Sequence, residues 1–183
     1  MTFVSAYHGA TSSGPFVGYI RPDSDVQSSD WAPAPLWQEI DDNSDLTFVY
    51  SSSSTEVWPS YNTYDFECGL SSPTTYPDVG ATQGMILRVR LSVDEGNLPG
   101  TLGGCDFTYS LKQGTSTIIS NTYSASTLAT PVTSQYTLSV SEVNSITNHN
   151  DLRVFVTVNI GHASGDPDLQ AQCHWAEVQY YAR

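Results

Sequence analysis

Basic residues are scarce in this chain of 183 residues, which has 6 Lys and Arg against 19 Asp and Glu and a formal net charge of −13. Five of the six are arginines scattered along the chain, and Lys112 is the single lysine. Nucleic-acid phosphates and anionic lipid headgroups are bound by clustered Lys and Arg side chains. The composition therefore argues against a nucleic-acid partner and against binding to an anionic membrane.

Long apolar runs are also missing. No run approaches the roughly 20 residues that a membrane-spanning helix requires. The first residues, MTFVSAYHGATSSG, have neither a basic start nor an apolar core. We therefore expect no signal peptide, and synthesis in the cytoplasm of the producing cell.

Cysteine is rare and irregularly placed. Cys68, Cys105 and Cys173 are far apart, odd in number and outside any C-x-x-C pair. We expect three small buried side chains rather than disulfides or a zinc site. Metal-ligand spacing is also absent from the four histidines, which are His8, His149, His162 and His174.

What the sequence does contain is a repeated alternation of apolar and polar residues with a period of two. It is clearest in GMILRVRLSVD, CDFTYSLKQG, DLRVFVTVN and CHWAEVQYYAR, and weaker in TFVSAY, DLTFVYSS, TYDFECGL, STIISNTYS and SQYTLSVS. Such alternation predicts half-buried antiparallel strands. Eight or more strands between Gly, Pro, Ser and Asn turns predict an all-β fold, an antiparallel β-sandwich of the jelly-roll type.

Two segments break this pattern. RPDSDVQSSDWAPAPLWQEI is punctuated by prolines and is predicted to lie over the sandwich as a flap. The other, residues 141–148, is predicted to form one short helical turn, with Ser141 as N-cap and Glu142 in the first turn. Val143 and Ile146, spaced i and i+3, would then close one end of the sandwich.

Few residues suit catalysis. Glu67 and Glu177 are strand carboxylates that could converge, as a glycoside hydrolase requires, but each also suits an outward strand position. The sequence has no G-x-S-x-G and no phosphate-binding glycine loop, so we expect no enzyme. We also expect no cofactor; a structural calcium ion at the turn with Asp166 and Asp168 is the alternative.

Aromatic residues in predicted loops are candidate binding groups. Trp31, Trp37, Trp58 and Tyr61 suit stacking on sugars, and they equally suit a protein partner. The alternative for these side chains is packing beneath the flap.

The chain contains RPDSDVQSSDWAPAPLWQEIDD, then RVR, then YTLSVSEVNSITNHNDLRV and finally HWAEVQYYA. In this order the stretches resemble a family of small virion-associated structural proteins of tailed bacteriophages. The resemblance covers most of the chain after about Tyr19, with Val143 departing from the alanine common at its position. The matching residues are Arg21, Pro22, Asp25, Trp31, Leu36, Ile40, Asp41, Arg88, Arg90, Tyr136, Thr137, Leu138, Glu142, Ile146, Asp151, Leu152, Arg153, Trp175 and Glu177.

This resemblance implies a β-sandwich protein of the virion and supplies no catalytic motif. The acidic composition, rich in Ser and Thr, favours the outer surface of the head. We expect a decoration, or cement, protein assembled in the host cytoplasm, a homotrimer that stabilises the shell by binding several subunits of the major capsid protein. The alternatives are a tail or fibre component, or a carbohydrate-binding module that attaches to host glycans.

The first residues lie outside the resemblance. Residues 1–18 are predicted to form an N-terminal arm, and residues 19–183 a single β-sandwich domain. Phe3, Tyr7 and Phe16 are the arm residues expected to dock on the capsid.

Overall fold

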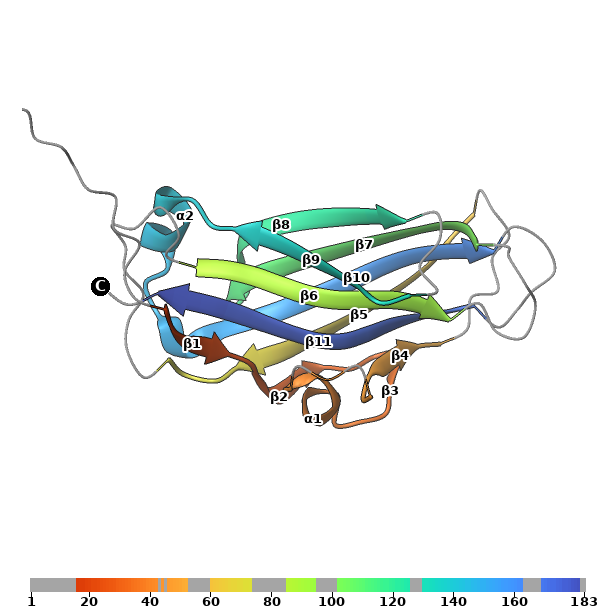
Figure 1. Cartoon of the computed structure of the whole chain (residues 1–183), viewed down its shortest axis with the longest axis horizontal. Helices are drawn as coiled ribbons and strands as arrows, with labels where there is room; N and C mark the ends of the chain where they lie inside the picture. Colours follow the sequence, from red (N-terminus) through yellow and green to blue (C-terminus); the bar gives the residue numbers. More distant parts are fainter. Residues whose placement is uncertain are drawn as a thin grey trace, which may run out of the picture.

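The computed structural model describes residues 16–42, 44, 46–52, 60–73, 85–94, 102–125, 130–162 and 169–181. These residues form two antiparallel sheets that stack face to face, as Figure 1 shows. The fold class predicted from the alternating pattern is thereby confirmed. Among the described residues, no helix is long and apolar enough to cross a membrane.

The first sheet, sheet A, has the strand order β3-β4-β11-β6-β9, and β1 pairs with β11. Its strands are β1 (Phe16–Ile20), β3 (Trp31–Ala32), β4 (Val49–Ser51), β6 (Met85–Asp94), β9 (Val132–Thr137) and β11 (Gln170–Tyr181). β4 pairs with β11 at Gln172 and Cys173, and β1 pairs with it from Val178 to Tyr181. Two short strands therefore line the same edge of β11 at its two ends.

The second sheet, sheet B, has the strand order β2-β5-β10-β7-β8. Its strands are β2 (Pro22–Gln27), β5 (Asn62–Leu70), β7 (Leu102–Gln113), β8 (Ser116–Ala125) and β10 (Leu152–His162). β1 belongs to sheet A and β2 to sheet B, so the chain crosses between the sheets at Arg21.

The core lies between the sheets and is built from the predicted apolar positions. On β10, Val154, Val156 and Val158 are fully buried, whereas Arg153, Phe155 and Thr157 between them are partly exposed. β7 repeats this alternation from residue 104 to 109, because successive strand residues point to opposite faces. β6 and β11 are buried on both faces over part of their length. Cys68, Cys105 and Cys173 are buried and unpaired, as expected.

One end of the sandwich is closed by α2 (Val140–Ser145) and the 3-10 turn η1 (His149–Asp151). Val143 and Ile146 are buried there, which confirms their predicted role. The predicted cap was wrong: Ser139, and not Ser141, is the N-cap. Its side chain accepts from the Glu142 N–H while Glu142 accepts from the Ser139 N–H, a reciprocal capping box that a cap at Ser141 would forgo.

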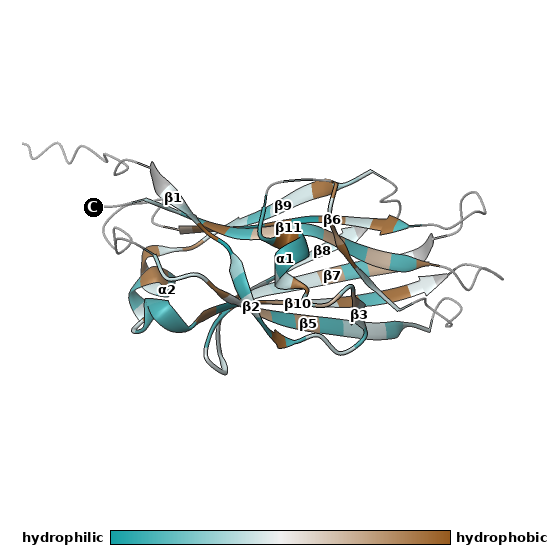
Figure 2. Ribbon diagram, turned by 90° about the horizontal axis from the view of Figure 1, so that it is seen from below, coloured by the Kyte–Doolittle hydropathy of each residue, from teal (hydrophilic) through white to brown (hydrophobic). Residues whose placement is uncertain are grey.

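The proline-rich flap closes the side of the sandwich with α1 (Trp37–Ile40), which Figure 2 shows between the two sheets. Leu36 and Ile40 are fully buried, and Trp31 packs edge-on against Phe66 at 4.9 Å between ring centroids. The Asp25 carboxylate accepts hydrogen bonds from the N–H groups of Leu36 and Trp37, both at 2.9 Å.

The boundary of the predicted arm falls within a strand. The β1 backbone pairs Phe16 with Tyr181, so the sheet begins three residues before the expected domain start at residue 19. Phe3 and Tyr7 lie outside the described residues.

Candidate functional site

Folding gathers the basic residues that are scattered in the sequence. Arg21 and Arg88 converge on Glu177, on the outer face of sheet A. Lys112 and Arg153 converge on Glu67, on the outer face of sheet B. Each outer face of the sandwich therefore carries one buried carboxylate held by two cations.

Glu177 is the most buried charged side chain of sheet A, with 1% of its surface exposed. One carboxylate oxygen accepts from Arg21 Nε at 3.2 Å and Arg21 Nη2 at 3.0 Å, and the other accepts from Arg88 Nη1 at 2.7 Å. Burying a carboxylate is costly unless its charge is paired, and the two guanidinium groups offset this cost. The ion pairs with Glu177 therefore hold the side chains of Arg21 and Arg88 against β11.

Aromatic rings extend this cluster in both directions along β11. The Arg21 guanidinium lies 5.2 Å from the centroid of the Tyr19 ring, and that of Arg88 lies 5.3 Å from the centroid of Trp175. Beyond Trp175, the Phe48 ring lies 5.3 Å from His174 and 6.4 Å from Tyr50. We call this series the β11 strip: Tyr19, Arg21, Glu177, Arg88, Trp175, His174, Phe48 and Tyr50.

The strip is long, and its ends are its most exposed parts. Tyr19 pairs with Gln179 and Tyr50 with Gln172, so the two tyrosines stand roughly 20 Å apart at about 3.3 Å per strand residue. Tyr19 is 40% exposed and Tyr50 is 36% exposed, whereas Trp175 between them is 4% exposed. The strip thus offers two accessible rings separated by fixed guanidinium groups.

Ser92 and His174 are within hydrogen-bond reach beside the strip, with Ser92 Oγ 2.8 Å from His174 Nε2. This spacing occurs in nucleophile–base pairs, which also require an accessible hydroxyl whose proton faces the imidazole. Here Ser92 donates its proton to Gln172 Oε1 at 2.7 Å, and both Ser92 and His174 are buried. The arrangement supports the packing of β6 against β11.

Glu67 and Glu177, the carboxylates considered for hydrolysis, do not converge. Glu67 accepts hydrogen bonds from Lys112 and Arg153 on sheet B, and Glu177 lies on the opposite outer face. The core separates them. These two residues therefore do not form the paired site that glycoside hydrolysis would require.

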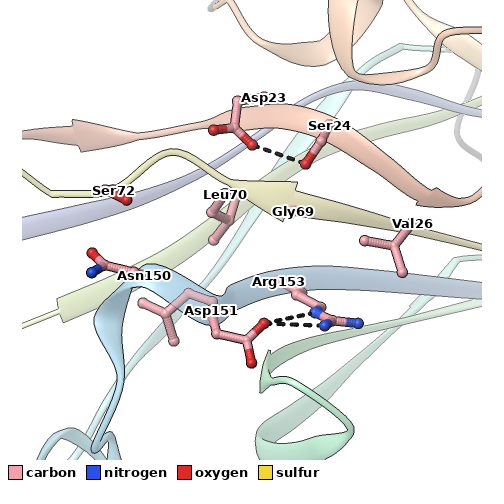
Figure 3. A pocket seen from close by; sticks show the side chains of 10 residues that line it. Asp23, Ser24, Val26, Gly69, Leu70, Ser72, Asn150, Asp151 and Arg153 are labelled. Carbon is pink, nitrogen blue, oxygen red and sulfur yellow. Dashed lines mark hydrogen bonds and ion pairs between the residues drawn. The ribbon is translucent and has the colours of Figure 1, made fainter.

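A polar pocket of about 320 Å³ opens on the outer face of sheet B, beside the Glu67 cluster. Figure 3 shows Gly69 of β5 between Ser24 of β2 and Arg153 of β10, and the strand register places the three residues in one row. Asp23 and Asp151 line opposite sides of the opening.

Among the described residues, no group of three or more His, Cys, Asp and Glu side chains converges as a metal site requires. The turn with Asp166 and Asp168 lies outside those residues.

The loop aromatics chosen from the sequence are dispersed in the structure. Trp31 is 4% exposed in the core, and Trp37 is partly buried against it. Tyr61 is 38% exposed, and Trp58 lies outside the described residues. Sequence reasoning missed Tyr19 and Tyr50, because their alignment depends on the pairing of β1 and β4 with β11.

No family model and no curated protein matches the chain. Solved structures with a distant likeness include TmCBM61 in complex with β-1,4-galactotriose, with 6% identity, a TM-score of 0.45 and coverage of 91% of each chain. Another is the arabinose-bound α-L-arabinofuranosidase MgGH51, with 12% identity and a TM-score of 0.46. A third is SGBP-B, from a complex xyloglucan utilization locus in Bacteroides uniformis, with 15% identity and a TM-score of 0.40.

The match covers 92% of this chain but 27% of the arabinofuranosidase, and 91% of this chain but 47% of SGBP-B. At these scores the likeness assigns neither ligand nor activity to the chain.

Proposed function

We propose that this protein is a non-catalytic carbohydrate-binding β-sandwich domain whose contact surface is the β11 strip. The observation that supports this proposal is the series of rings and guanidinium groups along β11, in which Tyr19, Tyr50 and the two arginines reach solvent over a buried Trp175. Sugars present apolar C–H faces and rims of hydroxyl groups. Aromatic rings with an apolar body suit the faces, and fixed polar groups suit the hydroxyls.

The rigidity of the strip favours binding. Arg21 and Arg88 are 32% and 23% exposed, and each is held by Glu177. Ordering a long side chain on binding costs about 0.5–1.5 kcal/mol. That cost is reduced here, because the ion pairs already order both arginines. The length of the strip, with exposed tyrosines at its ends, suits a chain of several sugar units better than one ring.

The test is binding of the whole chain to a panel of soluble oligosaccharides, measured by isothermal titration calorimetry. The panel includes β-1,4-galactotriose, arabino-oligosaccharides and xyloglucan oligosaccharides. We expect Tyr19→Ala and Tyr50→Ala each to weaken binding about tenfold, the loss of roughly 1.4 kcal/mol of stacking.

Tyr61→Ala is the matched control, because Tyr61 is a tyrosine of similar exposure outside the strip. Binding that survives both strip substitutions, or that depends on Tyr61 alone, would overturn the proposed surface. A panel without any bound oligosaccharide would overturn the proposed function.

A role as a virion surface protein is the second candidate, favoured by the ordered motif of the bacteriophage family. Several motif residues have structural roles in this fold: Asp25 caps α1, Glu142 caps α2, and Trp31 packs in the core. The motif therefore supports shared architecture more directly than a shared partner. Purified capsid shells that co-sediment with the protein and melt at a higher temperature with it would favour this role.

A further inference from the structure

The polar pocket on the outer face of sheet B is a candidate ligand site separate from the β11 strip. Gly69 and its strand neighbour Leu70 both line the pocket, and Cys68 on the other side of Gly69 is fully buried. A Cβ atom at position 69 would lie 2.4 Å from Ser24 Oγ, so any other residue there would force this hydroxyl to move. The pocket thus exists because β5 lacks a side chain between Ser24 and Arg153.

The walls of the pocket present both acceptors and donors. Asp23 accepts from Ser24 Oγ at 3.0 Å through Oδ1, and its Oδ2 accepts no hydrogen bond from the described part of the chain. Asp151 accepts hydrogen bonds from Arg153 Nε and Nη2 through Oδ1, at 3.2 and 3.0 Å, and its side chain is 43% exposed. Its Oδ2 lies on the side of Gly114, where an added Cβ atom would be 3.0 Å away. Ser72 and Asn150 close one end, as Figure 3 shows.

Hydrogen bonds hold the Arg153 side chain in position but do not use all of its N–H groups. Three of its five N–H groups bind Asp151 and Glu67, and the other two bind none of the residues that the structure describes. The same hydrogen bonds raise the pKa of the guanidinium, with Glu67 the largest cause and Asp151 the next. The pocket therefore contains the permanently charged guanidinium of Arg153, which lies between the carboxylates of Asp151 and Glu67.

This mixture of charges selects among ligand classes. A small cation would be attracted by Asp23 and Asp151 but repelled by Arg153. A small anion would be attracted by Arg153 but repelled by the two carboxylates. Neutral hydroxyl groups can donate to the carboxylates and accept from the guanidinium at once. The volume of about 320 Å³ is at the low end of the roughly 300–1,000 Å³ of small-molecule sites.

We infer that this pocket binds a single neutral sugar ring, or the terminal ring of a glycan, through hydrogen bonds to Asp23, Asp151 and Arg153. The inference does not depend on the β11 strip, because the pocket lies on the opposite sheet. If both proposals hold, the domain contacts carbohydrate on two faces.

The test is an NMR titration of the ¹⁵N-labelled whole chain with neutral methyl glucoside, galactoside and mannoside. n-Butylammonium and acetate serve as probes of a cation and an anion. We expect at least one glycoside to shift the amide signals of Ser24, Gly69 and Ser72 in a saturable manner, and both ions to leave them in place. Silence of these amides with every glycoside, or an equal response to n-butylammonium, would overturn the inference.

Variants make the assignment specific. Asp23→Ala removes an exposed carboxylate that, within the described ranges, bonds only to Ser24, and it should weaken glycoside binding about tenfold. Asp106→Ala is the matched control, on the same face of sheet B but near the opposite end of β10. Equal weakening by both variants would contradict the site.

The outcomes for the two proposals are separable. The amides of Gln172 and Gln179 report on the β11 strip, and that of Gly69 reports on the pocket. Oligosaccharide binding at the strip with a silent pocket overturns this inference alone. Glycoside binding in the pocket with a silent strip overturns the proposed strip surface alone.

Discussion

At the scale of single residues, a buried carboxylate with two arginines organises the outer face of sheet A. Glu177 is 1% exposed, whereas Arg21 and Arg88 remain partly in solvent. Loss of the Glu177 carboxylate would leave the guanidinium groups of Arg21 and Arg88 close together without a counter-charge. Because both can still hydrate, the penalty should be smaller than the roughly 3–5 kcal/mol typical of a broken buried pair.

We expect Glu177→Gln to lower the free energy of unfolding by about 2 kcal/mol. The measurement is a urea unfolding curve, in which the midpoint should fall at constant slope. Glu39→Gln is the control, because Glu39 of α1 makes no ion pair with the described residues, and it should change the free energy by less than about 0.5 kcal/mol. An unchanged midpoint for Glu177→Gln would show that the ion pairs contribute nothing net.

At the scale of elements, α2 is too short to be stable by itself and depends on its cap and its buried face. Glu142 bonds the Ser139 N–H at 2.7 Å and Tyr136 Oη at 3.0 Å. Partial desolvation raises the Glu142 pKa, but the hydrogen bonds from Ser139 and Tyr136 outweigh it and leave the pKa below its ordinary value. The turn is therefore joined to β9 as well as capped.

Ser139→Ala should lower the free energy of unfolding by about 1 kcal/mol, the usual cost of losing an N-cap. Ser141→Ala is a matched control, because the one side-chain hydrogen bond of Ser141 to a described residue is with the Ser139 hydroxyl, at 3.0 Å. We expect the control to change stability by a few tenths of a kcal/mol at most. Thermal unfolding of both variants measures the difference, and an equal effect would contradict the assignment of the cap to Ser139.

At the scale of the whole molecule, local patterns predicted the strands, and long-range pairing decided the candidate sites. The alternation in residues 151–159 was sufficient to place Val154 and Val156 inside, because the side-chain period of a strand is two. The cap was misplaced by two residues, because Ser139 and Ser141 both suit an N-terminus and only the reciprocal bond with Glu142 separates them.

The surface sites could not be predicted in the same way. Tyr19 and Tyr50 lie on two short edge strands, and they align only because both strands pair with β11. Gly69 resembles any strand glycine until the register places Ser24 and Arg153 on either side of it. Trp31 suited a binding loop by its neighbours, yet the flap carries it into the core against Phe66. Sequence alone gives no such pairing between distant segments.

The three cysteines allow a test of whether the two sheets unfold together. Cys68 and Cys105 lie in sheet B and Cys173 in sheet A, each at most 2% exposed. Burial raises the pKa of all three thiols, that of Cys173 to about 12. The thiolate is the reactive form, so the native chain should react with a disulfide reagent only after opening.

We expect no thiol to react in the folded protein and all three to react in concentrated urea, with labelling midpoints that coincide with the loss of far-UV circular dichroism. Mass spectrometry of labelled peptides assigns each midpoint to its cysteine, and the fully unfolded chain provides the reference for complete reaction. Labelling of Cys68 and Cys105 at a lower urea concentration than Cys173 would show that sheet B opens first. Rapid labelling of any one thiol in buffer would contradict its burial.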